Sequence, residues 1–227
     1  MALQDDMTVE LTRVGRVIAA FDLVTAFGHV SRRTSPTSFE ITVLGDLATL
    51  GPSDVIGVDI DDDALPAGAP GESWLHAEIY RSRQDIDAIV RAQPVSAFAV
   101  AAVTDSMRPL HGQAAWLGAA VPVLATPRLI RSRELGLAAA RALGNAGGLL
   151  LRANGAVTVG PHPGIAAARM WLLSTACDIW LRAQAAGEAA ELDEADVEAW
   201  TAAAPPLLDR LWRAMAFRAG RMAGGTL

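Results

Sequence analysis

The sequence predicts an α/β fold of the α+β layered kind, in which a sheet is covered by helices. Two observations predict it. Segments with the apolar period of a helix are mixed along the chain with short apolar runs typical of strands. The order of these segments lacks the regular strand–helix–strand alternation of a parallel sheet. The 227 residues, 52% of them hydrophobic, are predicted to form a single domain, 1–227, around one sizeable core.

The predicted elements follow in chain order. Apolar spacing predicts helices at 8–26, 72–83, 94–104, 132–143 and 163–187. Short apolar runs between turn residues predict strands at 39–43, 55–60, 86–91, 121–125, 149–151 and 157–159. Asn154-Gly155 predicts a hairpin with a type I′ turn, in which both residues take positive φ. Residues 188–227 are predicted to form a helical extension, packed either on a neighbouring subunit or within its own.

Composition narrows the function. A net charge of -6 argues against a nucleic-acid binder. All 19 basic residues are arginine, so no lysine can form an imine with a carbonyl substrate. The one cysteine, Cys177, lies in an apolar helical run and is expected to be buried and inert. The N-terminal residues show no signal peptide, and the apolar stretch 163–187 carries Arg169 and Asp178, as expected of a core helix. We therefore expect a soluble cytoplasmic protein with no membrane partner.

Two polar segments have both a structural and a chemical interpretation. Gly28–Arg33 follows the first predicted helix and is either a glycine helix stop before a polar turn, or a loop that binds an anion. Glu72 and His76 stand four residues apart and share one helix face. They are either a carboxylate placed for the helix dipole beside a solvated histidine, or an acid/base group with its partner.

The stretch "AIVRAQP", residues 88–94, raises a further question. Its apolar run stops at Arg91, and Gln93 follows two positions later. Side chains two apart on a strand point to the same face. The two residues therefore either mark a strand end that turns into solvent, or enter a pocket together.

Read together, three segments resemble the class II aldolase/adducin family. They are "FGHVSRR", "PGESWLHAEIYRSRQDIDAIVRAQP" and "LLLRANGAVTVG" before a long helix, and their order and spacing match over roughly residues 8–187. "GHVS.R" is similar to the branch that holds hydroxy-methylpyridine-dicarboxylate decarboxylase and related lyases on aromatic acids. The sugar-phosphate aldolases of the family usually have Asn after that Gly.

The resemblance implies a three-layer sandwich with a mostly antiparallel central sheet between helices, assembled as homotetramers with the pocket near a subunit interface. It also implies a mechanism. Family members hold a divalent metal with three histidines, two in a His-x-His at a strand end and one in a His-Gly hairpin, and the metal stabilises an enediolate. A Glu acts as acid/base, and Glu72 stands at the matching position.

This chain departs from the family at all three ligand positions. Arg91 and Gln93 stand at the His-x-His, and Asn154 stands at the third His. A guanidinium has no lone pair to offer a metal, and amide oxygens bind zinc or manganese less well than imidazole. We therefore expect no metal at the usual site and no other cofactor.

The resulting hypothesis is a metal-independent lyase, decarboxylase or isomerase that acts on a small carboxylic or carbonyl compound through an enolate. Arg91 would bind the anion, Glu72 would move the proton, and His29 or His76 would assist. The expected substrate contacts also include Ser31, Arg33, Gln93, Asn154 and His111.

Two alternatives stay open. Loss of the ligands is also expected of a non-catalytic binding or assembly protein with this fold. A metal could instead be held by a rearranged set, His29, Glu72, His76 and His111.

Overall fold

The structure, a computed structural model, describes residues 2–222 and 224, and side chains from residue 10 onward. Its centre is an eight-stranded sheet with the order β3-β2-β1-β4-β8-β7-β6-β5. The strands are β1 (His29–Ser35), β2 (Ser38–Thr42), β3 (Val55–Asp59), β4 (Ala88–Ala92), β5 (Ser106–Met107), β6 (Val121–Leu124), β7 (Gly148–Leu151) and β8 (Gly155–Gly160). Neighbouring strands are antiparallel except β6 and β7, which run parallel. The mostly antiparallel sheet is therefore confirmed.

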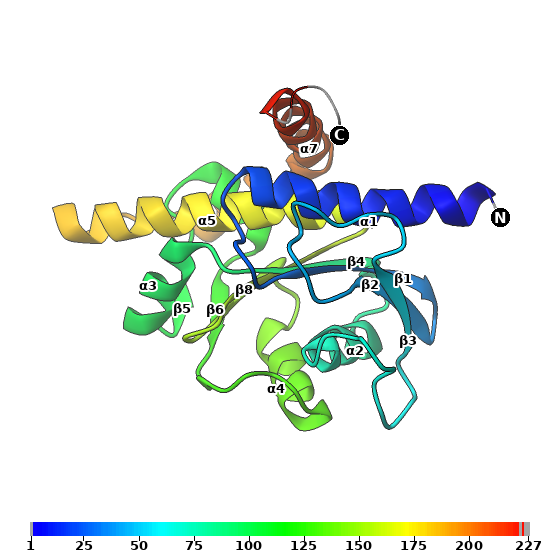
Figure 1. The fold of residues 1–227 in the computed structure, drawn as a ribbon. Coiled ribbons are helices and arrows are strands. Elements are labelled where there is room, and N and C mark those ends of the chain that lie inside the picture. Colours follow the sequence, from blue (N-terminus) through cyan, green and yellow to red (C-terminus); the bar gives the residue numbers. More distant parts are fainter. Residues whose placement is uncertain (1, 223, 225–227) are drawn as a thin grey trace.

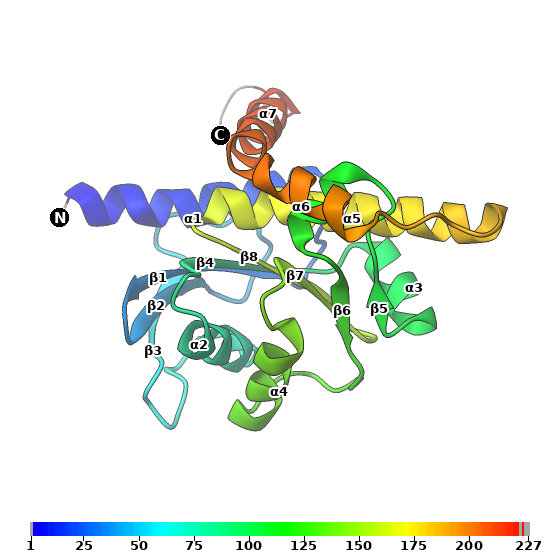
Figure 2. The same ribbon diagram turned by 180° about the vertical axis from the view of Figure 1, so that it is seen from behind.

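Helices cover both faces of the sheet (Figures 1 and 2). They are α1 (Ala2–Ala20), α2 (Ser73–Ser82), α3 (Val95–Val103), α4 (Arg133–Leu143), α5 (Pro163–Ala186), α6 (Glu194–Ala202) and α7 (Ala204–Met222), with the 3-10 helix η1 (Gly112–Leu117). Helices α1, α5 and α7 lie over one face, and α2 and α4 lie over the other. The three predicted layers are thus present.

Strand β4 shows how the sheet divides its side chains between the two faces. Val90 and Ala92 belong to the core under α1 and α5, whereas Ile89 belongs to the core under α2 and α4. The two-residue period of a strand then places Arg91 on the α2 side together with Ile89. The chemistry-bearing residues of this strand therefore face α2.

Of the segment Gly28–Arg33, predicted as a loop or a polar turn, residues 29–33 instead form the start of β1. Helix α1 ends at Ala20, so Gly28 is not its stop. The prediction fails because β1 pairs on both sides, with β2 and with β4, and Val30 enters the core. Long-range pairing overrides the polar local pattern, and it gives His29 and Ser31 fixed positions on one sheet face.

The hairpin at Asn154-Gly155 exists, but its turn differs from the predicted type I′. Three residues, 152–154, connect β7 to β8, and the Asn154 N–H donates to the Leu151 carbonyl at 2.9 Å. Positive φ falls on Ala153 (58°) and Gly155 (81°), and not on Asn154. A Cβ at position 155 would overlap the Ala92 carbonyl oxygen, so glycine lets this turn lie against the end of β4.

The C-terminal extension packs within its own chain. Helix α7 contacts α1 and α5, and Leu208, Met215 and Ala219 are buried in their shared core. Of the two packing modes left open by the sequence, this structure contains the one within the subunit.

Burial also raises the pKa of Cys177 to about 12, as expected of an inert thiol. Among the described residues, no helix combines the length and apolar character needed to span a membrane.

We expect Leu208→Ala to lower the free energy of unfolding by about 2–5 kcal/mol, because it leaves a cavity between α7 and the rest of the core. Phe217→Ala on the same helix is the control. Its side chain is 68% exposed, so the expected change is within about 0.5 kcal/mol. Urea unfolding followed by far-UV circular dichroism measures both values. The packing described here is contradicted if the two costs are reversed.

Candidate active site

Polar side chains from four segments meet on the α2 side of the sheet. Glu72 is the N-cap of α2, and His76 lies one turn further on the same helix face. His29 on β1 stands directly opposite Arg91 on β4 in the strand register. Asn154 reaches the same place from the β7–β8 turn. Local spacing therefore supplies pairs of residues, and strand pairing brings the pairs together.

The centre of the cluster is the guanidinium of Arg91, whose residue is only 1% exposed. It donates through Nη1 to the Phe27 carbonyl at 3.0 Å and through Nη2 to the carbonyl and the side-chain oxygen of Asn154. Its Nη2 also lies 3.6 Å from Oε1 of Glu72. Of the two interpretations of "AIVRAQP", the structure shows the buried one.

Asn154 links the two charges. Its Nδ2 donates to Oε1 of Glu72 at 2.9 Å, while its Oδ1 accepts from Arg91. A carboxylate needs a donor and a guanidinium needs an acceptor, so the two partners fix the orientation of the amide. Nε2 of Gln93 also points at this oxygen, at 3.5 Å. The amide thus bridges an ion pair that is largely withdrawn from water.

Glu72 is held in its ionised form. Burial by itself would raise the pKa of this carboxyl, but the hydrogen bond from His29 and the charge of Arg91 outweigh burial. The pKa falls to about 2. At neutral pH the side chain is therefore a carboxylate that can accept a proton.

A chain of four hydrogen bonds runs from Glu72 into the core. Oε2 of Glu72 lies 3.3 Å from Nε2 of His29, and Nδ1 of His29 lies 2.9 Å from Nε2 of His76. Nδ1 of His76 is 2.6 Å from the Ser31 hydroxyl, which is 2.8 Å from the Tyr80 hydroxyl. The far end of the chain is closed, because Tyr80 is fully buried.

The charge of Glu72 sets the direction of this chain. Burial, together with the charge of Arg91, lowers the pKa of His29 and lowers that of His76 further, so both rings are neutral at pH 7. Because Glu72 can only accept, His29 must donate from Nε2 and accept at Nδ1. His76 then donates from Nε2 and accepts at Nδ1 from Ser31. Each ring is thereby held in one tautomer.

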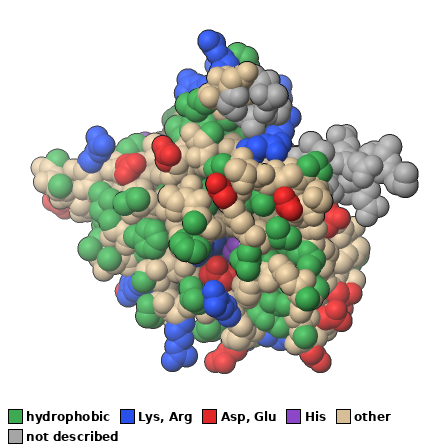
Figure 3. Space-filling view, in the orientation of Figure 1, with side chains coloured by type: hydrophobic (Ala, Val, Ile, Leu, Met, Phe, Trp, Pro, Cys, Tyr) green, Lys and Arg blue, Asp and Glu red, His purple; other side chains and the backbone are tan. Residues whose placement is uncertain are grey.

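The cluster opens to the surface through a small hollow with a volume of about 70 Å³. Glu72, His29, Arg91 and Arg131 line it, together with apolar and glycine residues of the neighbouring loops. Figure 3 shows this face of the molecule, with histidine atoms visible in a recess between basic and acidic side chains. An incoming molecule therefore meets the Glu72 carboxylate and the neighbouring arginines directly.

The structure brings together seven of the nine predicted site residues: His29, Ser31, Glu72, His76, Arg91, Gln93 and Asn154. Arg33 is used elsewhere, since its guanidinium donates to the backbone carbonyls of Tyr80 and Arg83. His111 precedes η1, which contacts α5 and α6. The geometry gives neither Arg33 nor His111 a place in the hollow.

Sequence reasoning missed two members of the site. Tyr80 closes the hydrogen-bond chain, and its spacing of four from His76 is a signal that could have found it. Arg131 lines the hollow from the loop before α4. No local pattern marks it, because its position depends on how that loop passes the start of α2.

The residues present do not fit the divalent metal that the family resemblance implies. Arg91 offers no lone pair, and the side-chain oxygen of Asn154 already accepts from this guanidinium. Both ring nitrogens of His29 and of His76 are engaged in the hydrogen-bond chain. No group of three His, Cys, Asp or Glu in the described part of the chain is arranged to hold a metal ion, and the rearranged set with His111 is not assembled there.

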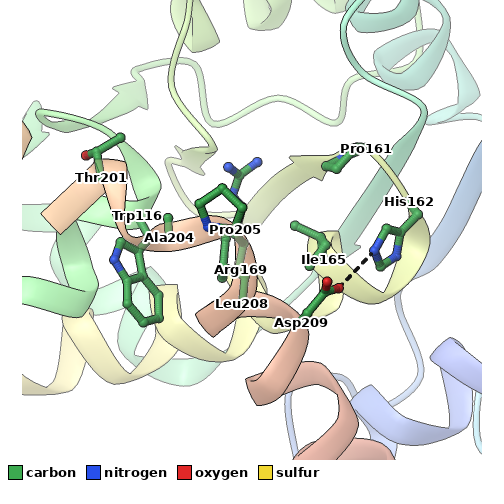
Figure 4. Close-up of a pocket in the computed structure, with 10 residues that line it drawn as sticks. All are labelled: Trp116, Pro161, His162, Ile165, Arg169, Thr201, Ala204, Pro205, Leu208 and Asp209. Carbon is green, nitrogen blue, oxygen red and sulfur yellow. Dashed lines mark ion pairs between the residues drawn. The ribbon is translucent and has the colours of Figure 1, made fainter.

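A larger cavity of about 420 Å³ lies between α5 and the C-terminal helices. Figure 4 shows that it is lined largely by apolar side chains, and that His162 and Asp209 face each other. Nε2 of His162 lies 3.4 Å from Oδ1 of Asp209. None of the seven clustered residues lines this cavity. Its polar side chains are the ion pair, Thr201 and Arg169, whose guanidinium donates to the Val159 carbonyl. The smaller hollow, which holds the clustered residues, is therefore the better candidate site.

The fold and the cluster at the end of β4 define a domain of the class II aldolase type. Residues 9–181 match the family described as Class II Aldolase and Adducin N-terminal domain, and the chain belongs to this family. A solved L-fuculose-1-phosphate aldolase from Thermus thermophilus is 31% identical, with a TM-score of 0.71 over 80% of this chain and 95% of that one.

Several curated relatives are named 3,4-dihydroxyphthalate decarboxylase. The protein from Arthrobacter keyseri is 32% identical over 144 residues, which cover 56% of this chain and 58% of that protein. The protein from Terrabacter sp. (strain DBF63) is 30% identical over 207 residues, which cover 84% and 85%. The chain thus spans little more than half the length of the first relative and most of the second.

The buried histidines predict an unusual pH dependence of stability. Their pKa values are lowered in the folded state, so the unfolded chain binds more protons below pH 6.5 and stability falls as the pH drops. We expect His76→Asn to be less stable at pH 7 and to lose stability less steeply below pH 6.5. One imidazole contributes a slope of up to about 1.4 kcal/mol per pH unit.

Urea unfolding at a series of pH values from 5.0 to 7.5 measures this slope. Ser31→Ala is the matched control, because it removes one hydrogen bond of the same chain and keeps both imidazoles. It should be destabilised and keep the wild-type slope. Equal slopes in all three proteins would show that His76 is not held neutral by burial.

Proposed function

We propose that this chain is a carbon–carbon lyase, most simply a decarboxylase, that acts on a small hydroxylated aromatic or unsaturated acid without a divalent metal. The observation that carries the proposal is the ionised Glu72 bound to Arg91 and Asn154 at the inner end of an open hollow. Membership of the class II aldolase family and the decarboxylase names of the relatives support this reaction class. The homotetramer and the cytoplasmic location stay predictions.

The geometry supports a division of roles. Glu72 accepts the proton of the substrate hydroxyl. Its pKa of about 2 keeps it ionised at neutral pH but makes it a weak base, so the proton transfer depends on stabilisation of the resulting anion by Arg91. Arg91 then lies beside the oxygen that becomes negative, in a site with little water, where a fixed charge stabilises an enolate or phenolate most. His29 donates to Glu72 from its locked tautomer and holds the carboxylate in position.

The reaction balances with these residues and one water molecule. When the Glu72 carboxylate takes the hydroxyl proton, the electron density of the phenolate moves to the ring carbon that bears the carboxylate, and this carbon takes a proton from water at the open end of the hollow. The bond from this carbon to the carboxylate then breaks, carbon dioxide leaves with the hydroxide as bicarbonate, and the electron pair restores the aromatic ring and the phenolate. The Glu72 carboxyl returns its proton to the phenolate oxygen and is ionised again.

We expect the purified protein, dialysed without chelator, to contain less than about a tenth of an equivalent of any transition metal, and its turnover to be unchanged by EDTA. The reason is that the ligand positions hold a guanidinium, which has no lone pair to offer, and two amides, of which the Asn154 oxygen already accepts from Arg91. Elemental mass spectrometry and carbon dioxide release from hydroxybenzoates test this. A near-stoichiometric metal whose removal abolishes turnover would refute metal independence.

Glu72→Gln is expected to lower kcat by about 100-fold or more, because the amide cannot accept the proton. Glu134→Gln is the control, since that carboxylate lies in the first turn of α4 and outside the hollow. Steady-state kinetics and the melting temperature are measured for both variants. Equal kcat in the wild type and Glu72→Gln would show that Glu72 has no role in the reaction.

If the wild type binds such acids but shows no turnover, the result would favour the alternative that the chain is a non-catalytic binding protein.

A further inference from the structure

Arg131 is the one arginine in the hollow that the described part of the protein leaves unbound. It lies in the loop directly before Ser132, the N-cap of α4. Its stem passes beside Gly71, where a Cβ would come within 3.2 Å of its Cγ and Cδ atoms. Its residue is exposed, and no described residue forms a side-chain hydrogen bond or an ion pair with its guanidinium. The charge of Arg131 is therefore free to meet an anion at the mouth of the hollow.

The second arginine, Arg91, is in a different state. Its Nη atoms already donate to Phe27 and Asn154, and the carboxylate of Glu72 lies beside it. The charged groups that line the hollow are thus one carboxylate and two guanidiniums, because His29 is neutral at pH 7. The uncompensated positive charge belongs to Arg131, at the outer edge.

The size of the hollow fixes which end of a ligand lies where. About 70 Å³ is far below the roughly 300 Å³ or more of typical small-molecule pockets. Only one end of a substrate enters, and the rest lies at the rim, where Phe27 and Leu44 are 67% and 71% exposed. A hydroxyl at the inner end meets Glu72, and a carboxylate at the outer end meets Arg131.

We infer that Arg131 anchors the carboxylate of a substrate that carries a single negative charge, and so selects hydroxylated monocarboxylic acids over their neutral and dicarboxylic analogues. This inference rests on the proposed function and narrows its substrate class. A guanidinium suits the task because its fork binds both carboxylate oxygens. The same placement leaves the leaving carbon dioxide at the open end of the hollow.

The test compares Kd values from isothermal titration calorimetry at low salt. The probes are 4-hydroxybenzoate, its neutral amide 4-hydroxybenzamide, and the dicarboxylate 4-hydroxyphthalate. Arg131→Gln should weaken binding of the benzoate by about 10-fold or more and leave the amide unchanged, because only the acid loses a charge-assisted hydrogen bond. Arg131→Lys should recover part of the loss. Arg128→Gln is the matched control, an exposed arginine in the same loop that does not line the hollow.

The outcomes separate this inference from the proposed function. If the wild type binds the benzoate and Arg131→Gln binds it equally well, or loses acid and amide alike, Arg131 is not the anchor. If the phthalate binds the wild type more tightly than the benzoate, selection for a single charge is wrong. If the wild type binds none of a wider set of hydroxylated acids, the proposed function itself fails.

Discussion

The site depends on the charge of Arg91, a residue of the central strand β4 that is almost completely shielded from water. A buried guanidinium is tolerated only where acceptors and an opposite charge surround it. Those partners come from three segments: the chain before β1 supplies the Phe27 carbonyl, the start of α2 supplies Glu72, and the β7–β8 turn supplies Asn154. One charge thereby fixes the relative positions of three parts of the chain that are far apart in sequence.

The order of the remaining polar groups follows from that ion pair. Because the hydrogen bond from His29 and the charge of Arg91 keep Glu72 ionised, this carboxylate can only accept, and each further group along the chain is restricted to one role. The last group in the chain is Tyr80, whose hydroxyl lies in the core. Burial raises the pKa of this hydroxyl, so it stays protonated. A closed chain of this kind does not lead protons to solvent. It orients the carboxylate and fixes the tautomers of two histidines that burial keeps neutral.

The two faces of the sheet serve different purposes. The face under α1, α5 and α7 is a continuous apolar core that anchors the C-terminal helices. The face under α2 and α4 also has an apolar core, but its polar cluster lies where β1, β4 and β8 meet the start of α2. Polar groups gather there because strand ends and a helix N-terminus leave room for an opening. The rigid opposite layer holds the strands that carry them.

The sequence by itself determined the features that depend on local period and composition. The two-residue spacing of Arg91, in β4, and Gln93, just after it, predicts that both lie on one face, and the four-residue spacing does the same for Glu72 and His76. The absence of lysine removes imine chemistry. Most helices and strands follow the apolar pattern to within a few residues.

Only the tertiary structure decided which of these faces meet. His29 and Ser31 became strand residues through pairing with two neighbours, which a polar segment does not reveal. Arg33 belongs to the same polar segment, but its guanidinium donates to backbone carbonyls at the end of α2 and just after it. Arg131 lines the hollow although no local sequence pattern predicts it. Even Asn154, placed by its hairpin, obtained its role from Arg91 and Glu72. Local spacing fixes where a side chain points along its own element, and the long-range contacts of that element fix what it touches.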